Sequence, residues 1–192
     1  MRIHWKQLVL ASALAAALPP SSAQTAAIDP ALFAKANAGD PAAQVQVGES
    51  YAAGKGIAHD LNQAAEWYRK AAAKNDVSAE LHLAALYRDG GKGFPRDMEQ
   101  AADWYRKAAE LGDVTAQATL GLLYSLGQGL PKSDVEAYFW FDLAASEKGP
   151  KQEQYAANRQ LIGTHITTNE LEEVQERVAR WLAAHPRPAA TK

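Results

Sequence analysis

The 192-residue chain contains no cysteine, and its charges nearly cancel. Without cysteine the protein can form no disulfide, no thiolate nucleophile and no lipid-bearing cysteine after a leader. It has 20 Lys and Arg residues against 22 Asp and Glu residues, a formal net charge of -2. A mildly acidic protein has no general electrostatic attraction to phosphate backbones, so we expect no nucleic-acid partner.

The chain also lacks an apolar run long enough to span a bilayer. Its most apolar stretch, Leu8–Leu18, has about half of the roughly 20 residues that a spanning helix needs. This stretch follows Arg2 and Lys6 and precedes two prolines and three small residues, which is typical of a secretory signal rather than a membrane anchor. We therefore expect residues 1–23 to be a signal peptide cleaved after Ala23. The mature protein would then lie in a bacterial periplasm, with no stable membrane insertion.

An internal repeat of 36 to 37 residues is the strongest pattern in the chain. One block reads Ala-Ala-acidic-Trp-Tyr-Arg-Lys-Ala-Ala in its first two copies, is looser in its third, and occupies residues 64–72, 101–109 and 137–145. A second block ends in Tyr51, Tyr87 and Tyr124. Two linked blocks that keep one period mark a repeat architecture, in which each copy is one supersecondary unit.

Each period contains two amphipathic helices. In the block at 64–72 the apolar residues follow the i, i+3, i+4, i+7, i+8 spacing of a helix with one buried face. On its polar face Glu66 and Lys70 are spaced for i to i+4 pairing, as are Asp103 and Lys107. The other helix of each period has a small residue three positions before its tyrosine, so an aromatic side chain of a neighbouring helix can approach closely there. These small residues are Gly48, Ala84 and Gly121.

Glycine-containing turns join the two helices of each period. The Gly-x-Gly motif recurs at residues 54–56, 91–93 and 127–129. A phosphate-binding loop is excluded because no strand precedes the motif and no third glycine follows it. The motif instead indicates a helix-ending turn. Asp60, Asp97 and Ser133 then stand where the N-cap of the next helix is expected.

Together these motifs resemble the Sel1-like repeat family, a relative of the tetratricopeptide repeat. The resemblance implies an all-α protein, an α-solenoid of antiparallel helix pairs wound into a right-handed superhelix. It covers residues 41–145, in three repeats at about 41–76, 77–113 and 114–145. The third copy departs from the pattern, because Phe139 and Leu143 replace its acidic residue and its lysine.

The ends of such an array need caps, because a repeat cannot leave its last apolar face in water. Residues 24–40 are expected to form a linker and an N-terminal capping helix, equivalent to a lone second helix. Residues 146–185 are expected to form C-terminal capping helices that cover Phe139 and Leu143, and residues 186–192 a flexible tail. Within this cap, Thr167-x-x-Glu170 is a capping box.

The chain offers little catalytic chemistry. None of the histidines after residue 23 forms a His-x-x-x-His or His-x-His pair, so we expect no metal site and no cofactor. Some Sel1-like proteins have been linked to penicillin binding or hydrolysis, which leaves a β-lactamase-like or peptidoglycan-active enzyme of the cell envelope as the alternative function. Against this alternative, the chain has neither a Ser-x-x-Lys nor a Gly-x-Ser-x-Gly motif. We therefore expect no enzymatic activity.

A binding surface is the remaining functional feature. In a solenoid of this kind the first helices line the concave wall, and helical spacing from their buried stripes predicts the exposed residues. The candidate binding residues are Gln46, Glu49, His82, Arg88, Asp89, Thr119, Leu122 and Leu126. The wall changes from acidic and polar to apolar along its length, which suits an extended peptide or a partner helix. Alternatively, the C-terminal helices cover Leu122 and Leu126.

The sequence thus favours a non-catalytic periplasmic scaffold that binds a protein or peptide through its concave face, with peptidoglycan association as a further possibility. Charge reversal at Glu49 and Asp89 is expected to weaken partner capture without lowering thermal stability. Substitution of Trp104 by alanine is expected to cost about 3–5 kcal/mol by opening the core.

Overall fold

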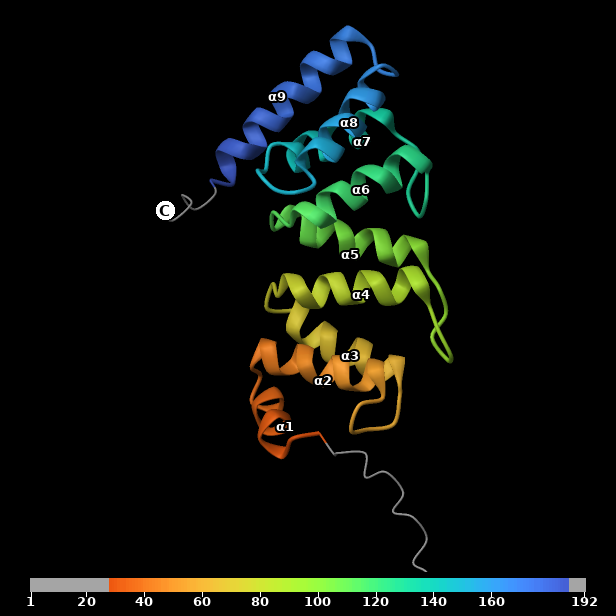
Figure 1. Cartoon of the computed structure of the whole chain (residues 1–192), viewed down its shortest axis with the longest axis vertical. Helices are drawn as coiled ribbons and strands as arrows, with labels where there is room; N and C mark the ends of the chain where they lie inside the picture. The colour runs from red at the N-terminus through yellow and green to blue at the C-terminus, as the bar shows by residue number, and fades with distance from the viewer. Residues whose placement is uncertain (1–27, 187–192) are drawn as a thin grey trace, which may run out of the picture.

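The computed structural model of the chain describes residues 28–186. The predicted signal peptide, residues 24–27 of the predicted linker and residues 187–192 of the predicted tail lie outside this range. Between residues 28 and 186 the backbone forms nine α-helices, and its sole β feature is an isolated bridge between Gly91 and Phe94. Figure 1 shows these helices stacked into an elongated array.

The helices are α1 (Pro30–Asn37), α2 (Pro41–Ala53), α3 (Leu61–Ala72), α4 (Val77–Asp89), α5 (Met98–Glu110), α6 (Val114–Leu126), α7 (Asp134–Ala145), α8 (Gln152–Gly163) and α9 (Thr168–Ala184). Consecutive helices pack against each other from α1 through α8, and α9 packs on α7. The all-α solenoid of helix pairs predicted from the repeat is confirmed. Its complete pairs are α2 with α3, α4 with α5 and α6 with α7.

Side-chain caps begin the helices where the sequence predicted them. Asp60 and Asp97 accept backbone N–H bonds at the start of α3 and α5, and Ser133 does so at the start of α7. These bonds satisfy N–H groups that lack a partner within the helix. The capping box of Thr167 and Glu170 at the start of α9 is also present.

Aromatic side chains of the second helices pack into gaps left by small residues of the first helices. A Cβ atom added at Gly48 would lie 2.5 Å from the ring of Tyr68, and one added at Gly121 would lie 3.1 Å from the ring of Phe141. Tyr68 and Phe141 are both buried. The predicted close approach at these glycines is therefore confirmed, and the residue that fills the gap is the one after the tryptophan.

The predicted i to i+4 pairs on the second helices are wrong. Lys70 lies over the ring of Trp67, with its Nζ atom 3.7 Å from the ring centre, and Lys107 lies in the same way over Trp104. The acidic residue pairs with the arginine three positions later, as Glu66 does with Arg69 at 2.5 Å. A cation above an indole face is attracted by the ring quadrupole. The lysine therefore contacts the tryptophan instead of the acidic residue with which it was expected to pair.

The C-terminal helices cover the apolar residues of the third copy, as expected. Phe139 is 5% exposed and Leu143 is fully buried. The guanidinium of Arg177 on α9 lies 4.0 Å from the centre of the Phe139 ring and donates two hydrogen bonds, of 2.8 and 2.6 Å, to Glu136. Helix α9 thus covers the face of α7 that corresponds to the solvent-exposed polar face of the earlier second helices.

Helix α8 occupies the position of a first helix in a further repeat. Gln44 and Gln117, on first helices, each donate through their Nε2 atom to the carbonyl of an alanine in the preceding second helix. Gln152 of α8 donates in the same way to the carbonyl of Ala145. The solenoid therefore ends with a lone first helix at α8, as it begins with a lone second helix at α1.

Candidate protein-binding surface

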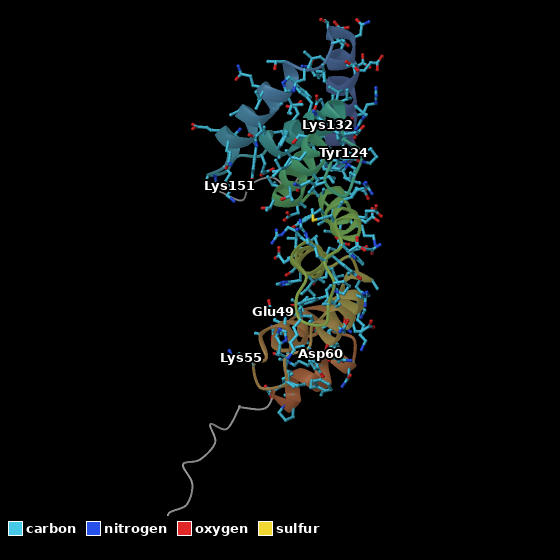
Figure 2. The ribbon with its side chains drawn as sticks, turned by 90° about the vertical axis from the view of Figure 1, so that its right-hand side faces the viewer. Glu49, Lys55, Asp60, Tyr124, Lys132 and Lys151 are labelled. Carbon is cyan, nitrogen blue, oxygen red and sulfur yellow. The ribbon has the colours of Figure 1, made fainter. Side chains whose placement is uncertain are left out.

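The predicted binding residues lie on the first helices α2, α4 and α6. We call the exposed side of these helices the first-helix face; it comprises Gln46, Glu49, Ala53, His82, Asp89, Thr119, Leu122 and Leu126. Figure 2 shows Glu49, near one end of the array, on the same side of the molecule as Lys151, which precedes α8. Asp60 and Lys132, from the turns that lead into the second helices, lie away from this side.

Glu49 and His82 come together across α2 and α4. The Oε1 atom of Glu49 lies 3.2 Å from Nε2 of His82, and both side chains remain at least one-third exposed. The imidazole stacks on Tyr68 with ring centres 4.7 Å apart and planes 9° apart. Burial, and secondarily the charge of Glu49, raises the pKa of Tyr68, so its hydroxyl stays neutral. The sequence placed these residues on one face but did not predict their contact.

Arg88 and Asp89 form a charged pair at the C-terminal end of α4. The guanidinium of Arg88 donates two hydrogen bonds of 2.8 Å to Asp89 and another of 2.8 Å to the hydroxyl of Tyr105. These bonds hold the pKa of Asp89 below its usual value. Because the two charges neutralise each other, α4 adds no net charge to the first-helix face at this point.

Leu122 and Leu126 are exposed. Their exposed fractions are 47% and 56%, so the alternative in which the C-terminal helices cover them is wrong. Thr119 precedes them by one turn, and its hydroxyl donates to the carbonyl of Thr115 within α6. An apolar pair one helical turn apart, open to solvent, is the kind of surface that a partner's apolar side chains can bury.

A cavity of about 650 Å³ lies where α1 meets the start of the first-helix face. Gln46, Glu49 and Ala53 of α2 line one side of it. Ile28, Asp29 and Leu32 line another, and the turn from Gly54 to Gly56 completes the lining. Leu32 of α1 and the two residues before this helix thereby add to the predicted site. Sequence reasoning assigned them to the linker and cap alone, because no local pattern shows that they line one cavity with Glu49.

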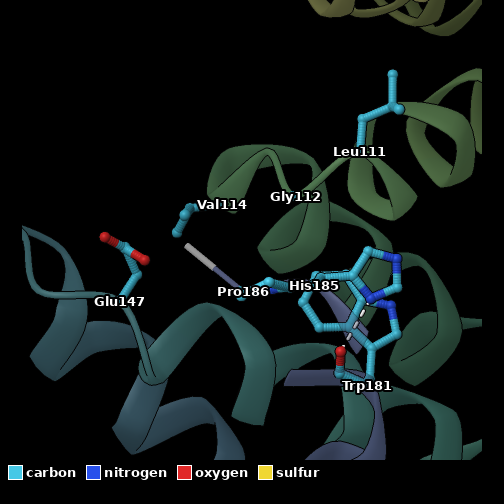
Figure 3. A pocket seen from close by; sticks show the side chains of 7 residues that line it. All are labelled: Leu111, Gly112, Val114, Glu147, Trp181, His185 and Pro186. Atoms are coloured by element: carbon cyan, nitrogen blue, oxygen red, sulfur yellow. Dashed lines mark hydrogen bonds between the residues drawn. The ribbon is translucent and has the colours of Figure 1, made fainter. Parts of the chain in front are cut away.

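A second cavity, of about 550 Å³, lies away from the first-helix face, at the edge where α9 ends (Figure 3). Trp181 and His185 stack there with ring centres 4.1 Å apart, and Leu111, in the turn after α5, and Val114, the first residue of α6, also line the cavity. Trp181 packs against the core, and because it is partly exposed it also lines this cavity.

Within residues 28–186 no three His, Cys, Asp or Glu side chains gather in a way that could hold a metal ion. Three of the four histidines in this range make separate contacts: His82 with Glu49, His165 with Asp134 and His185 with Trp181. In the same range, no helix has the length and apolar character required to cross a membrane.

One buried acid lies in a position where two other copies have glutamine. Glu80 is 3% exposed, and burial raises the pKa of its carboxyl group. Its Oε2 atom has no hydrogen-bond partner, as is also true of Oε1 in Gln44 and Gln117. Because an unpaired acceptor recurs at this position in every repeat, it belongs to the repeat's packing and marks no catalytic group.

Comparison with known proteins identifies the architecture. The family model of the Sel1 repeat matches three times, at residues 41–76, 77–113 and 114–148. The chain belongs to the Sel1 repeat family. Sel1 repeats generally mediate protein–protein interaction, and proteins built from them are generally non-catalytic scaffolds. No curated protein matches the chain.

Two crystal structures show the same fold. One is a protective antigen of uropathogenic Escherichia coli strains that displays an SLR fold, at 29% identity and a TM-score of 0.65 over 84% of this chain. This chain covers 36% of that antigen, about a third of its length. The other is a Sel1 repeat protein from Oxalobacter formigenes, at 31% identity and a TM-score of 0.57, covering 65% of this Sel1 repeat chain and 92% of that one.

Proposed function

We propose that this Sel1 repeat protein is a non-catalytic adaptor of the bacterial periplasm that binds a protein or peptide through its first-helix face. The observation that carries the proposal is the exposure of Leu122 and Leu126 on the face that also holds Glu49 and His82. In a family of interaction modules, an apolar pair and a polar pair on one face offer both affinity and orientation.

The proposal is supported by energetics. Fully burying a leucine side chain contributes roughly 1.5–3 kcal/mol, so leucines left in solvent mark a place where a partner can gain affinity. Helices that present residues one turn apart suit a partner helix or an extended segment. The periplasmic location rests on the signal-like character of residues 1–23.

The test uses a positional-scanning library of labelled decapeptides, with binding measured by fluorescence anisotropy. We expect micromolar binding by a subset of peptides with apolar residues, and Leu122→Ser should weaken it severalfold. Leu111→Ser is the matched control, because Leu111 is also 47% exposed but lies in the turn between α5 and α6. Equal effects of the two substitutions, or no binding by any peptide, would contradict the proposal.

The alternative, a β-lactamase-like or peptidoglycan-active enzyme, is tested separately. Incubation with a fluorescent penicillin followed by denaturing electrophoresis reveals a covalent adduct, and we expect none. Sedimentation with purified sacculi, with soluble muropeptides analysed in the supernatant, separates wall association from wall cleavage. A stable penicillin adduct or released muropeptides would replace the adaptor by an enzyme.

A further inference from the structure

We infer that the cavity between α1 and α2 is a socket for a lysine or arginine side chain of the bound partner. This inference rests on the proposed function, since it names the residue type that enters one end of the first-helix face. Its observation is the lining of the cavity, which combines apolar walls with two carboxylates.

The walls suit the aliphatic part of a basic side chain. Leu32 contributes partly exposed apolar surface from α1, Ile28 from the segment before it, and Ala53 from the end of α2. Lysine and arginine have three or four methylene groups that pack on apolar surface while the charged end reaches a polar group. A volume of about 650 Å³ is ample for one such side chain and the peptide backbone beside it.

The charges suit its cationic end. Glu49 and Asp29 both line the cavity, and the sole basic residue among the lining residues is Lys55, in the turn after α2. Oε1 of Glu49 also lies 3.2 Å from Nε2 of His82 outside the lining, so a bound cation would share this carboxylate with the imidazole. One carboxylate comes from α2 and the other from the N-cap of α1, so a cation between them would be held from two sides. Attraction of this kind fixes which residue enters and favours association of the correct partner.

An anionic ligand fits this place poorly. A helix N-terminus attracts anions through its free N–H groups. Asp29 already occupies the N-terminus of α1, where its Oδ1 atom accepts a 2.9 Å hydrogen bond from the N–H of Ala31. An incoming carboxylate or phosphate would meet Asp29 and Glu49 and would have Lys55 alone in its favour.

The socket has no equivalent in the later repeats of the first-helix face. In the register of Glu49, α4 has Ala85 and α6 has Leu122. In the register of Ala53, α4 has Asp89, whose charge Arg88 neutralises, and α6 has Leu126. A bound segment would therefore place its basic residue at α1 and α2 and its apolar residues toward α6, which fixes its direction along the face.

The experiment takes a decapeptide that binds in the library above and varies the position of strongest basic preference. The four residues compared there are lysine, arginine, norleucine and glutamate. Norleucine keeps the aliphatic chain and removes the charge. We expect lysine and arginine to bind about two- to fivefold more tightly than norleucine, the range that one solvent-exposed ion pair supplies, and glutamate to bind least. Raising the salt concentration should reduce the preference.

The matched protein variants are Glu49→Gln and Glu99→Gln. Glu99 is exposed on α5, a second helix, so its substitution changes the net charge equally and leaves the socket intact. We expect Glu49→Gln to remove most of the preference for lysine over norleucine and Glu99→Gln to leave it unchanged, with identical helical circular dichroism for both.

Two failures are distinguishable. If peptides bind and Leu122→Ser weakens them, but lysine, norleucine and glutamate bind alike, the socket is wrong and the adaptor function stands. If Glu99→Gln reduces the preference as much as Glu49→Gln, the preference comes from net charge and the socket is again wrong. If no peptide binds, the adaptor function is wrong and the socket with it.

Discussion

Arg159 of α8 donates a 2.6 Å hydrogen bond to Asp142 of α7. Asp142 lies in the register that holds an arginine in the two preceding second helices, and Arg159 lies in the register that holds a tyrosine in the two preceding first helices. Between α3 and α4, Arg69 donates to the hydroxyl of Tyr87 at 2.6 Å. Between α5 and α6, Arg106 donates to the hydroxyl of Tyr124 at 3.4 Å. The arginine therefore belongs to the second helix in the two earlier pairs and to the following first helix, α8, in the last pair. A side-chain hydrogen bond from an arginine links the two helices in all three pairs, although the accepting residue differs.

This exchange predicts a double substitution that restores the earlier pairing. Asp142→Arg alone places two guanidinium groups together and should lower the free energy of unfolding by about 1–3 kcal/mol, because Asp142 is largely buried. Asp142→Arg with Arg159→Tyr recreates the arginine and tyrosine of the two earlier pairs and should recover most of the loss. Urea unfolding midpoints measure both, and a double variant no more stable than the single one would contradict the equivalence.

Glu80 occupies the position that glutamine has in the other two repeats, and this equivalence predicts that Glu80→Gln stabilises the protein. Gln44 and Gln117 donate to backbone carbonyls of Ala36 and Ala109, a bond that an ionised Glu80 cannot make. At pH 7 the substitution should add about 1 kcal/mol, the usual net value of one hydrogen bond. Glu99→Gln, at an exposed site, should change the free energy of unfolding much less.

The advantage of Glu80→Gln should depend on pH in a defined direction. Because burial raises the folded-state pKa of Glu80, the folded protein holds this proton more tightly than the unfolded chain. The resulting stabilisation is fully present below the unfolded value of 4.5 and is lost as the pH rises through the folded pKa. Unfolding measured from pH 4 to pH 8 should show the variant gaining on the wild type as the pH increases; a constant difference would contradict this account.

Two tryptophans in one register should differ in their contribution to stability. Trp67 is 5% exposed and meets the edge of Phe33, with ring centres 5.5 Å apart, whereas Trp104 is only half-buried. Trp67→Ala should therefore cost about 3–5 kcal/mol. The sequence alone led to the same expectation for Trp104, but its partial exposure lowers the expected cost of Trp104→Ala to about 1–2 kcal/mol, measured by thermal and urea unfolding. Equal losses would show that exposure does not set the cost.

The attachment of α9 predicts a local effect of Arg177→Ala. The substitution removes the cation above Phe139 and both hydrogen bonds to Glu136, so α9 should exchange its amide hydrogens at least tenfold faster while α2 to α6 stay protected. Arg180→Ala on the same helix is the control, because Arg180 is 68% exposed and pairs with Glu176 alone. Mass spectrometry of deuterium uptake measures both, and uniform loss of protection would point to global destabilisation instead.

Prediction from the sequence succeeded where the determinants are local. The caps at Asp60, Asp97 and Thr167 depend on residues within one helical turn, so residue type and spacing were sufficient. Prediction failed where one side chain had two possible contact partners on the same helix. Lys70 had both Glu66 and Trp67 within reach along the helix, and only the packed side chains show that it lies on the indole.

The amino-acid sequence by itself determined that this protein is a stack of helix pairs, because a period of 36 to 37 residues with helical spacing leaves each unit an apolar face that only its neighbours can bury. Tertiary structure alone decided that Leu122 and Leu126 stay in solvent, that Glu49 meets His82 and that Leu32 of α1 lines a cavity together with Glu49. Those features join residues from different helices, and their distances depend on how successive helices cross, which no local pattern encodes.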